Sequence, residues 1–137
     1  MKFLPRHILI LFACIIILHF IANAVGLYDT PVVWFDNVLH MLAGAGFGLV
    51  WLWISESKSV RISQGYPASS MIGFVLCLAL VWELMEFLFL SYFTPYAYAL
   101  NIYSPSILEA SIDVISDLTG AVVLLFLNHV RHSTAVR

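Results

Sequence analysis

Charged residues are scarce in this chain. They make up 10% of its 137 residues, whereas 62% of the residues are hydrophobic. A typical soluble domain has about 25% charged residues, and a soluble fold of this length has too little interior to cover so much apolar surface. The composition therefore excludes a soluble globular protein and predicts an integral membrane protein with a single domain, residues 1–137.

Cysteine and basic residues are also few. Cys14 and Cys77 lie within apolar runs, so they predict neither a disulfide framework nor a metal-binding cysteine motif. We interpret both as small hydrophobic residues of the core. The net charge is −2, which offers no basic surface to a nucleic acid. The partners we expect are membrane lipids.

Long apolar segments, in contrast, are abundant. A helix needs about 20 apolar residues to cross a bilayer, and four segments qualify: residues 7–27, 31–54, 68–92 and 105–130. Thr30-Pro31 and Ser104-Pro105 each resemble a helix cap followed by proline in the first turn. We predict an all-α membrane fold, a bundle of four transmembrane helices.

The few basic residues predict the orientation of these helices. They precede the first span, lie between the second and third, or follow the fourth: Lys2, Arg6, Lys58, Arg61, Arg131 and Arg137. Because basic loops stay in the cytoplasm, both termini are predicted to be cytoplasmic. The start of the chain and "ANA" at 22–24 also resemble a signal peptide. His19 interrupts that apolar region, and we expect the segment to be retained as a span.

Most acidic residues lie inside the predicted spans. Only Asp29 and Glu56 lie in loops, and the other acidic residues are Asp36, Glu83, Glu86, Glu109, Asp113 and Asp117. The apolar centres of the spans contain no lysine or arginine to pair with them. Each ionised carboxylate at the centre of a bilayer costs about 2.5–3.5 kcal/mol. These side chains must therefore face one another, bind cations, hold protons or reach water.

The polar residues of the four spans also agree in depth. At about 1.5 Å per residue, the outermost lie about 6–9 Å from the outer ends of their spans. A second layer, which includes His19, His40, Glu83 and Asp113, lies about 12–14 Å deep, and Asp117 about 18 Å. Small residues follow on the same helical faces: Gly44, Gly48 and Ala121. This pattern predicts a polar pocket in the outer half of the membrane, closed below by tight helix packing.

Helical spacing indicates which of these residues share a face. Asp36 and His40 are four residues apart, Glu83 and Glu86 three apart, and Asp113 and Asp117 four apart. Glu109 belongs to the last row, but it also completes a capping box, "SILE", at 106–109. His19 and Asn23 on the first span belong either to the pocket or to a structural hydrogen bond between helices.

Carboxylates and imidazole are ligands for Mg, Mn, Fe or Zn. We therefore predict a divalent metal site whose ligands are drawn from Asp36, His40, Glu83, Glu86, Asp113 and Asp117. A metal here would activate water beside the outer leaflet, which favours a metal-dependent hydrolase acting on an envelope lipid or on another substrate near the membrane. Two alternatives stay open: an element of proton- or ion-coupled transport, and a module that binds a metal or ligand without catalysis.

Three stretches carry a family resemblance. They are "DNVLHMLAGAGFG" from Asp36, "WELMEF" from Trp82 and "DVISDLTGA" from Asp113. With them the chain resembles the VanZ-like membrane proteins, and more closely their YjdF-like relatives, because Glu86 and Asp117 stand where typical VanZ-like members have glutamine and asparagine. The resemblance implies a multi-pass protein of the bacterial cytoplasmic (inner) membrane. VanZ itself is associated with resistance to a glycopeptide antibiotic, which implies no particular reaction.

Overall fold

The computed structural model describes residues 5–29, 34–57, 68–103 and 106–134. Every element in these ranges is helical. In chain order they are α1 (Pro5–Ala24), the 3-10 turn η1 (Leu27–Asp29), α2 (Trp34–Ser57), α3 (Ala68–Tyr92), α4 (Thr94–Leu100) and α5 (Ile107–Thr134).

The four long helices correspond to the four predicted spans. Each is long and apolar enough to cross a membrane, over Pro5–Ala24, Trp34–Ser55, Ala68–Tyr92 and Ile107–His129. The bounds of the third span agree with the prediction. The second and fourth helices continue past the predicted ends, while residues 31–33 and 105 lie outside the described part of the chain.

The first span ends earlier than predicted, at Ala24 rather than residue 27. Gly26 has a φ of 69°, in the left-handed region that favours glycine. Its N–H donates to the carbonyl of Asn23 at 3.1 Å, and Val25 donates to Ile21 at 3.0 Å. This left-handed glycine terminates α1 and turns the chain into η1.

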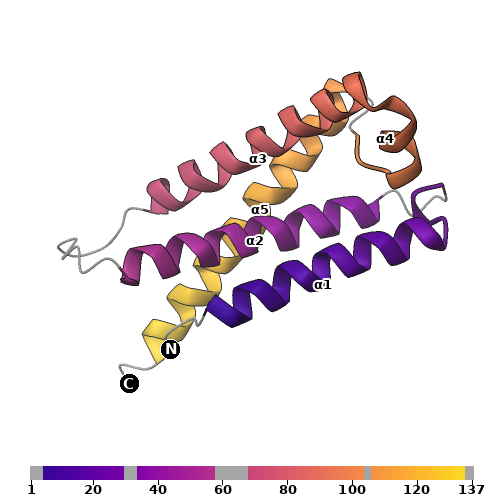
Figure 1. The fold of residues 1–137 in the computed structure, drawn as a ribbon. Helices are drawn as coiled ribbons and strands as arrows, with labels where there is room; N and C mark the ends of the chain where they lie inside the picture. The colour runs from indigo at the N-terminus through magenta and orange to yellow at the C-terminus, as the bar shows by residue number, and fades with distance from the viewer. Residues whose placement is uncertain (1–4, 30–33, 58–67, 104–105, 135–137) are drawn as a thin grey trace.

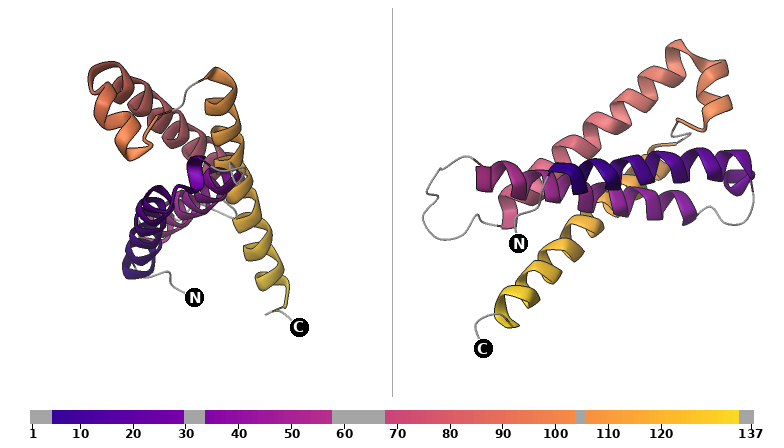
Figure 2. Two further views of the ribbon diagram at one scale, coloured as in Figure 1. Left: turned by 90° about the vertical axis from the view of Figure 1, so that its right-hand side faces the viewer. Right: turned by 60° about the horizontal axis from the view of Figure 1, so that its bottom comes forward.

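Helix α2 is the centre of the fold. It packs against α1, α3 and α5, and its most extensive contact is with α5, which crosses it obliquely (Figures 1 and 2). The helix ends gather at two ends of the molecule (Figure 1). One end holds the start of α1, the end of α2, the start of α3 and the end of α5. The other end holds η1 and α4. The orientation of the bundle in the membrane, with both termini in the cytoplasm, stays a prediction. Of the basic residues, only Arg6 has a described side chain.

Two glycines set the closeness of α2 and α5. A Cβ added to Gly44 would overlap the backbone carbonyl of Asp117, and one added to Gly120 would overlap the backbone carbonyl of Met41. The two backbones are therefore in direct contact, as the small residues on these faces predicted. Below this crossing an apolar core forms around Met71, Val75 and Ala121.

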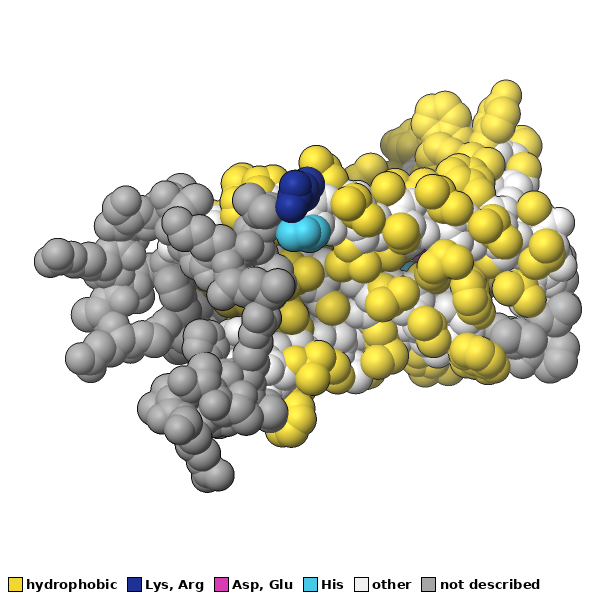
Figure 3. Space-filling view, turned by 90° about the horizontal axis from the view of Figure 1, so that it is seen from below, with side chains coloured by type: hydrophobic (Ala, Val, Ile, Leu, Met, Phe, Trp, Pro, Cys, Tyr) yellow, Lys and Arg dark blue, Asp and Glu magenta, His cyan; other side chains and the backbone are white. Residues whose placement is uncertain are grey.

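The outside of the bundle is hydrophobic. One face consists almost entirely of apolar side chains, and lysine and arginine colour appears only near one end (Figure 3). A continuous apolar surface of this kind suits contact with lipid. Cys14 and Cys77 are both exposed, so our placement of them in the core was wrong. Their apolar character fits a lipid-facing surface equally well, and sequence periodicity does not separate the two environments.

We expect Gly44→Ala to destabilise the fold by about 1–3 kcal/mol, the usual cost of overpacking a tight interface. The added methyl must push α5 away from α2. Gly73→Ala is the matched control, because a Cβ at Gly73 meets no atom within 4 Å. Unfolding of the detergent-solubilised variants by denaturant measures both effects. Equal stability of the two variants would contradict a direct backbone contact between α2 and α5.

Candidate functional site

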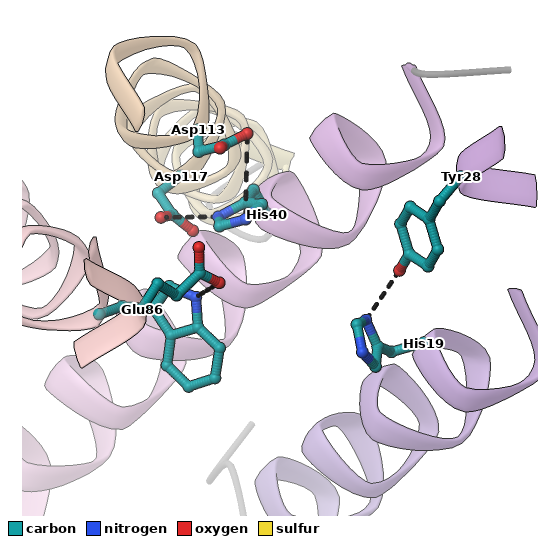
Figure 4. A network of polar contacts seen from close by, with 7 residues as sticks. His19, Tyr28, His40, Glu86, Asp113 and Asp117 are labelled. Atoms are coloured by element: carbon teal, nitrogen blue, oxygen red, sulfur yellow. Dashed lines mark hydrogen bonds and ion pairs between the residues drawn. The ribbon is translucent and has the colours of Figure 1, made fainter. Parts of the chain in front are cut away.

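His40 lies between two carboxylates of α5. Its Nδ1 is 3.3 Å from Oδ2 of Asp117, and its Nε2 is 3.9 Å from Oδ1 of Asp113. All three side chains are buried, and they point toward one another across the α2–α5 interface (Figure 4). Both ring nitrogens therefore face negative groups, and the imidazole is held in one orientation.

Asp36 brings a further carboxylate to this group from the preceding turn of α2. Each of Asp36, His40 and Asp113 offers one ligand atom, and these atoms lie within 4.8 Å of one another. Two atoms that each lie about 2.1 Å from one ion are at most about 4.2 Å apart. Nε2 of His40 and Oδ1 of Asp113, 3.9 Å apart, already satisfy this limit. The widest distance between two ligand atoms of the group has to shorten by at most roughly 0.6 Å.

Asp117 is the most deeply buried acidic side chain described, with 2% of its surface exposed. Its Oδ2 accepts a hydrogen bond from Nδ1 of His40. Its Oδ1 has no hydrogen-bond partner among the described residues. A buried polar atom without a partner is costly, so this oxygen indicates a position where a water, a proton or a cation would be stabilised.

The two acids of α3 lie beside this group. Glu86 is 8% exposed and accepts a hydrogen bond of 2.8 Å from Nε1 of Trp82. Figure 4 shows its carboxylate pointing toward Asp117 and His40. Glu83, one turn earlier, is partly exposed. The closest ligand group is thus formed by Asp36, His40 and Asp113, and the other three predicted ligands surround it.

A cavity of about 550 Å³ opens onto these residues. Asp36, His40, Glu86 and Asp117 form its polar side. Most of the remaining wall is apolar and comes from α1 and α2: Phe12, Ile15, Ile16, Phe20, Leu39, Ala43 and Phe47. His19, Trp82, Asn101 and Ile102 complete the lining. This volume lies within the usual range for small-molecule sites, about 300–1,000 Å³.

A separate hydrogen-bond network lies at the end of the cavity nearest η1 and α4. Tyr28 is 2.7 Å from Nδ1 of His19, and Nε2 of His19 is 2.9 Å from the carbonyl of Leu100 (Figure 4). A carbonyl only accepts, so Nε2 of His19 carries a hydrogen, and in that tautomer Nδ1 accepts from the hydroxyl of Tyr28. Burial, followed by the charges of Asp36 and Glu86, raises the pKa of Tyr28 above its ordinary value of 10.0. The hydroxyl therefore keeps the proton that it donates.

Asn23 adds a second connection at the same level. It donates to the carbonyl of Ala99 at 3.0 Å and accepts from Nδ2 of Asn101 at 2.6 Å. Asn101 caps α4 in a left-handed conformation with a φ of 48°. His19 and Asn23 thus join α1 to the end of α4, which supports the structural interpretation of this pair over a ligand role.

Glu109 also has a structural role. Its backbone N–H donates to Oγ of Ser106 at 3.2 Å, and Ser106 donates to Oε2 of Glu109 at 3.4 Å. The first bond is the serine half of the capping box that the "SILE" sequence predicted, while the Glu109 carboxylate meets the Ser106 hydroxyl instead of a backbone N–H. Because Glu109 is exposed, it stands apart from the buried acids of its own helical row.

Sequence reasoning missed three features near the site. It treated 93–104 as a loop, although Pro95 in the first turn of α4 and the asparagine cap at its end are recognisable signals. It assigned no polar contact to Tyr28 or Trp82. Their polar atoms meet His19 and Glu86, and only the pairing of Trp82 with Glu86, four residues apart, could have been read from spacing.

The chain matches the family described as "Predicted membrane protein (DUF2238)" over residues 3–134. It belongs to this family. No curated protein and no solved structure gives a significant match. The family agrees with the four apolar helices in showing a membrane protein, while the more specific resemblance to VanZ-like and YjdF-like proteins stays a prediction.

We expect Tyr28→Phe to destabilise the protein by about 1 kcal/mol, the usual worth of a hydrogen bond. The change removes only the hydroxyl that His19 accepts from. Tyr98→Phe is the control, because Tyr98 lies nearby on α4 and is 56% exposed. Thermal unfolding in detergent compares the two variants. A Tyr98→Phe effect as large as that of Tyr28→Phe would contradict the network described above.

Proposed function

We propose that this protein binds a divalent cation through Asp36, His40 and Asp113 in a pocket on the outer side of the bacterial cytoplasmic membrane. The cation is Zn, Mn, Fe or Mg, the metals that suit carboxylate and imidazole ligands. It activates water for the hydrolysis of an envelope lipid or another substrate near the membrane. Both termini lie in the cytoplasm. The observation that carries the proposal is the grouping of three ligand atoms within 4.8 Å, in which His40 and Asp113 are buried and Asp36 is half-buried.

The balance of charge favours a cation over a simple ion pair. The polar side of the cavity holds Asp36, Glu86 and Asp117 besides His40, with no lysine or arginine among the lining residues. A single imidazolium could neutralise only one of these carboxylates. A divalent cation, with protons on the remaining acids, offsets more of the cost of burying them.

Asp117 has a distinct role in this proposal. If Nε2 of His40 binds the cation beside Asp113, Nδ1–H of the same ring donates to Asp117 across the 3.3 Å contact. A carboxylate behind a metal-binding histidine fixes the tautomer and the direction of the ring. Glu86, which lines the same cavity from α3, is our candidate for the base that takes a proton from the activated water.

Transport has less support. A relay across the membrane needs polar groups along the whole path. Below Asp117 the glycine crossing brings the α2 and α5 backbones into contact, and the cluster of Met71, Val75 and Ala121 follows. The described polar groups therefore lead into the pocket from one side only.

Metal analysis of detergent-purified protein tests the site. We expect stoichiometric metal in the wild type and its loss in Asp113→Asn, which removes a ligand charge. Glu109→Gln is the matched control, since it lies on the same helical row but at the exposed cap. Asp117→Asn should weaken affinity by about 10–100-fold, the usual effect of losing such a supporting carboxylate. Wild-type protein without metal, or full retention in Asp113→Asn, refutes the proposal.

Hydrolysis is tested separately with phospholipid and peptide substrates. We expect Glu86→Gln to lower turnover by about 10²–10⁴-fold, as loss of a general base does, while the metal content stays unchanged. Glu109→Gln should leave both properties as in the wild type. If metal binds and neither kind of substrate is ever turned over, the protein is a non-catalytic binding module instead.

A further inference from the structure

The cavity beside the metal site is open on a side of the bundle that faces lipid. Ile16 and Phe20 of α1 both line it, and they are 56% and 50% exposed. Trp82 of α3 also lines it and is 43% exposed. Side chains that line a cavity and are also half-exposed mark its mouth. The mouth therefore lies between α1 and α3, in the part of each helix that would lie within the membrane.

Described residues border the cavity in two other directions. Asn101 and Ile102 line it at its outer end, where Asn101 is bonded to Asn23 and His19 to Leu100. At the inner end, Gly44 contacts the backbone of Asp117. Helix α1 packs mainly against α2, which leaves the side toward α3 open. A molecule dissolved in the hydrocarbon layer thus has direct access through this mouth.

The lining is divided into two parts of opposite character. Phe12, Ile15 and Ile16 form an apolar wall along α1, and Asp36, His40 and Asp117 line the cavity from α2 and α5. This division matches an amphiphile with a hydrocarbon chain and a polar head. A second apolar cavity of about 400 Å³ shares Trp82, Glu86 and Ile102 with the first, so a second chain has room beside the same carboxylates.

We propose that the ligand of this site is a phosphate-bearing membrane lipid that enters laterally between α1 and α3. Its chains lie along the apolar walls, and its phosphate oxygens complete the coordination of the cation held by Asp36, His40 and Asp113. The inference rests on the proposed metal site. Phosphate oxygens are hard ligands that suit Mg and Mn and are accepted by Zn. Since no lysine or arginine lines the cavity, the phosphate is attracted only when the cation is bound.

Native mass spectrometry of the detergent-purified protein tests this requirement. The protein is stripped of metal or loaded with Mn²⁺ or Zn²⁺, and then exposed to dioleoyl phosphatidic acid. Dioleoylglycerol lacks the phosphate, and glycerol 3-phosphate lacks the chains. We expect only phosphatidic acid to be retained, with at least tenfold less retention after metal removal. Equal retention with and without metal, or equal retention of dioleoylglycerol, overturns the inference. Retention of glycerol 3-phosphate at the same level places the recognition in the free phosphate and also overturns it.

Two neighbouring isoleucines provide a matched pair of variants. Ile16 and Ile17 are both 56% exposed, but only Ile16 lines the cavity. Ile16→Trp should fill the mouth and reduce phosphatidic acid retention at least tenfold, whereas Ile17→Trp should not change it. Ala43→Leu fills the same cavity from α2 and provides a second variant.

Metal content, measured in every sample, separates the two proposals. We expect it to be unchanged in these three variants, which also shows that they fold. Lipid retention that is unaffected by both Ile16→Trp and Ala43→Leu overturns the lipid inference while the metal site stands. A wild-type protein that binds no metal overturns the metal site and the lipid inference together.

Discussion

The close crossing of α2 and α5 is the contact on which the rest of this structure depends. Gly44 and Gly120 have no side chains to hold the helices apart, and each meets the backbone of the other helix. His40 lies one turn before Gly44, and Asp117 lies at the crossing itself. Because the backbones touch there, the side chains of the adjoining turns are forced into one small space. The buried contacts of His40 with Asp113 and Asp117 follow from this geometry.

Packing and chemistry are separated along the bundle. On one side of the crossing the helices enclose apolar residues around Met71, Val75 and Ala121. On the other side they diverge enough to leave a cavity lined by Asp36, His40, Glu86 and Asp117. Buried acids are expensive in a membrane, and this chain concentrates them where the helices leave room for a compensating ligand. The apolar packing is therefore concentrated in the tight half, and the polar side chains in the wider half.

Helix α1 has a different part in the structure from the other spans. It packs mainly on α2, and its polar residues His19 and Asn23 hold the end of α4 instead of joining the acidic group. Its apolar residues form the wall opposite the acids. A span that resembles an ordinary hydrophobic anchor in the sequence thus shapes the cavity and joins the end of α4 beside it. For this reason the cavity is lined by residues of all four long helices.

The sequence by itself determined the four spans, the shared face of Asp36 and His40, the shared face of Asp113 and Asp117, and the cap at Glu109. These depend on hydrophobic length and on helical periodicity, which are local properties. Only the tertiary structure decided that His40 meets Asp113 and Asp117 most closely, that His19 bonds to Leu100, and that Cys14 and Cys77 face outward. Periodicity gives the residues on a face but not the rotation of each helix toward its neighbours. That rotation was fixed by the glycine contacts between α2 and α5, which join residues far apart in the chain.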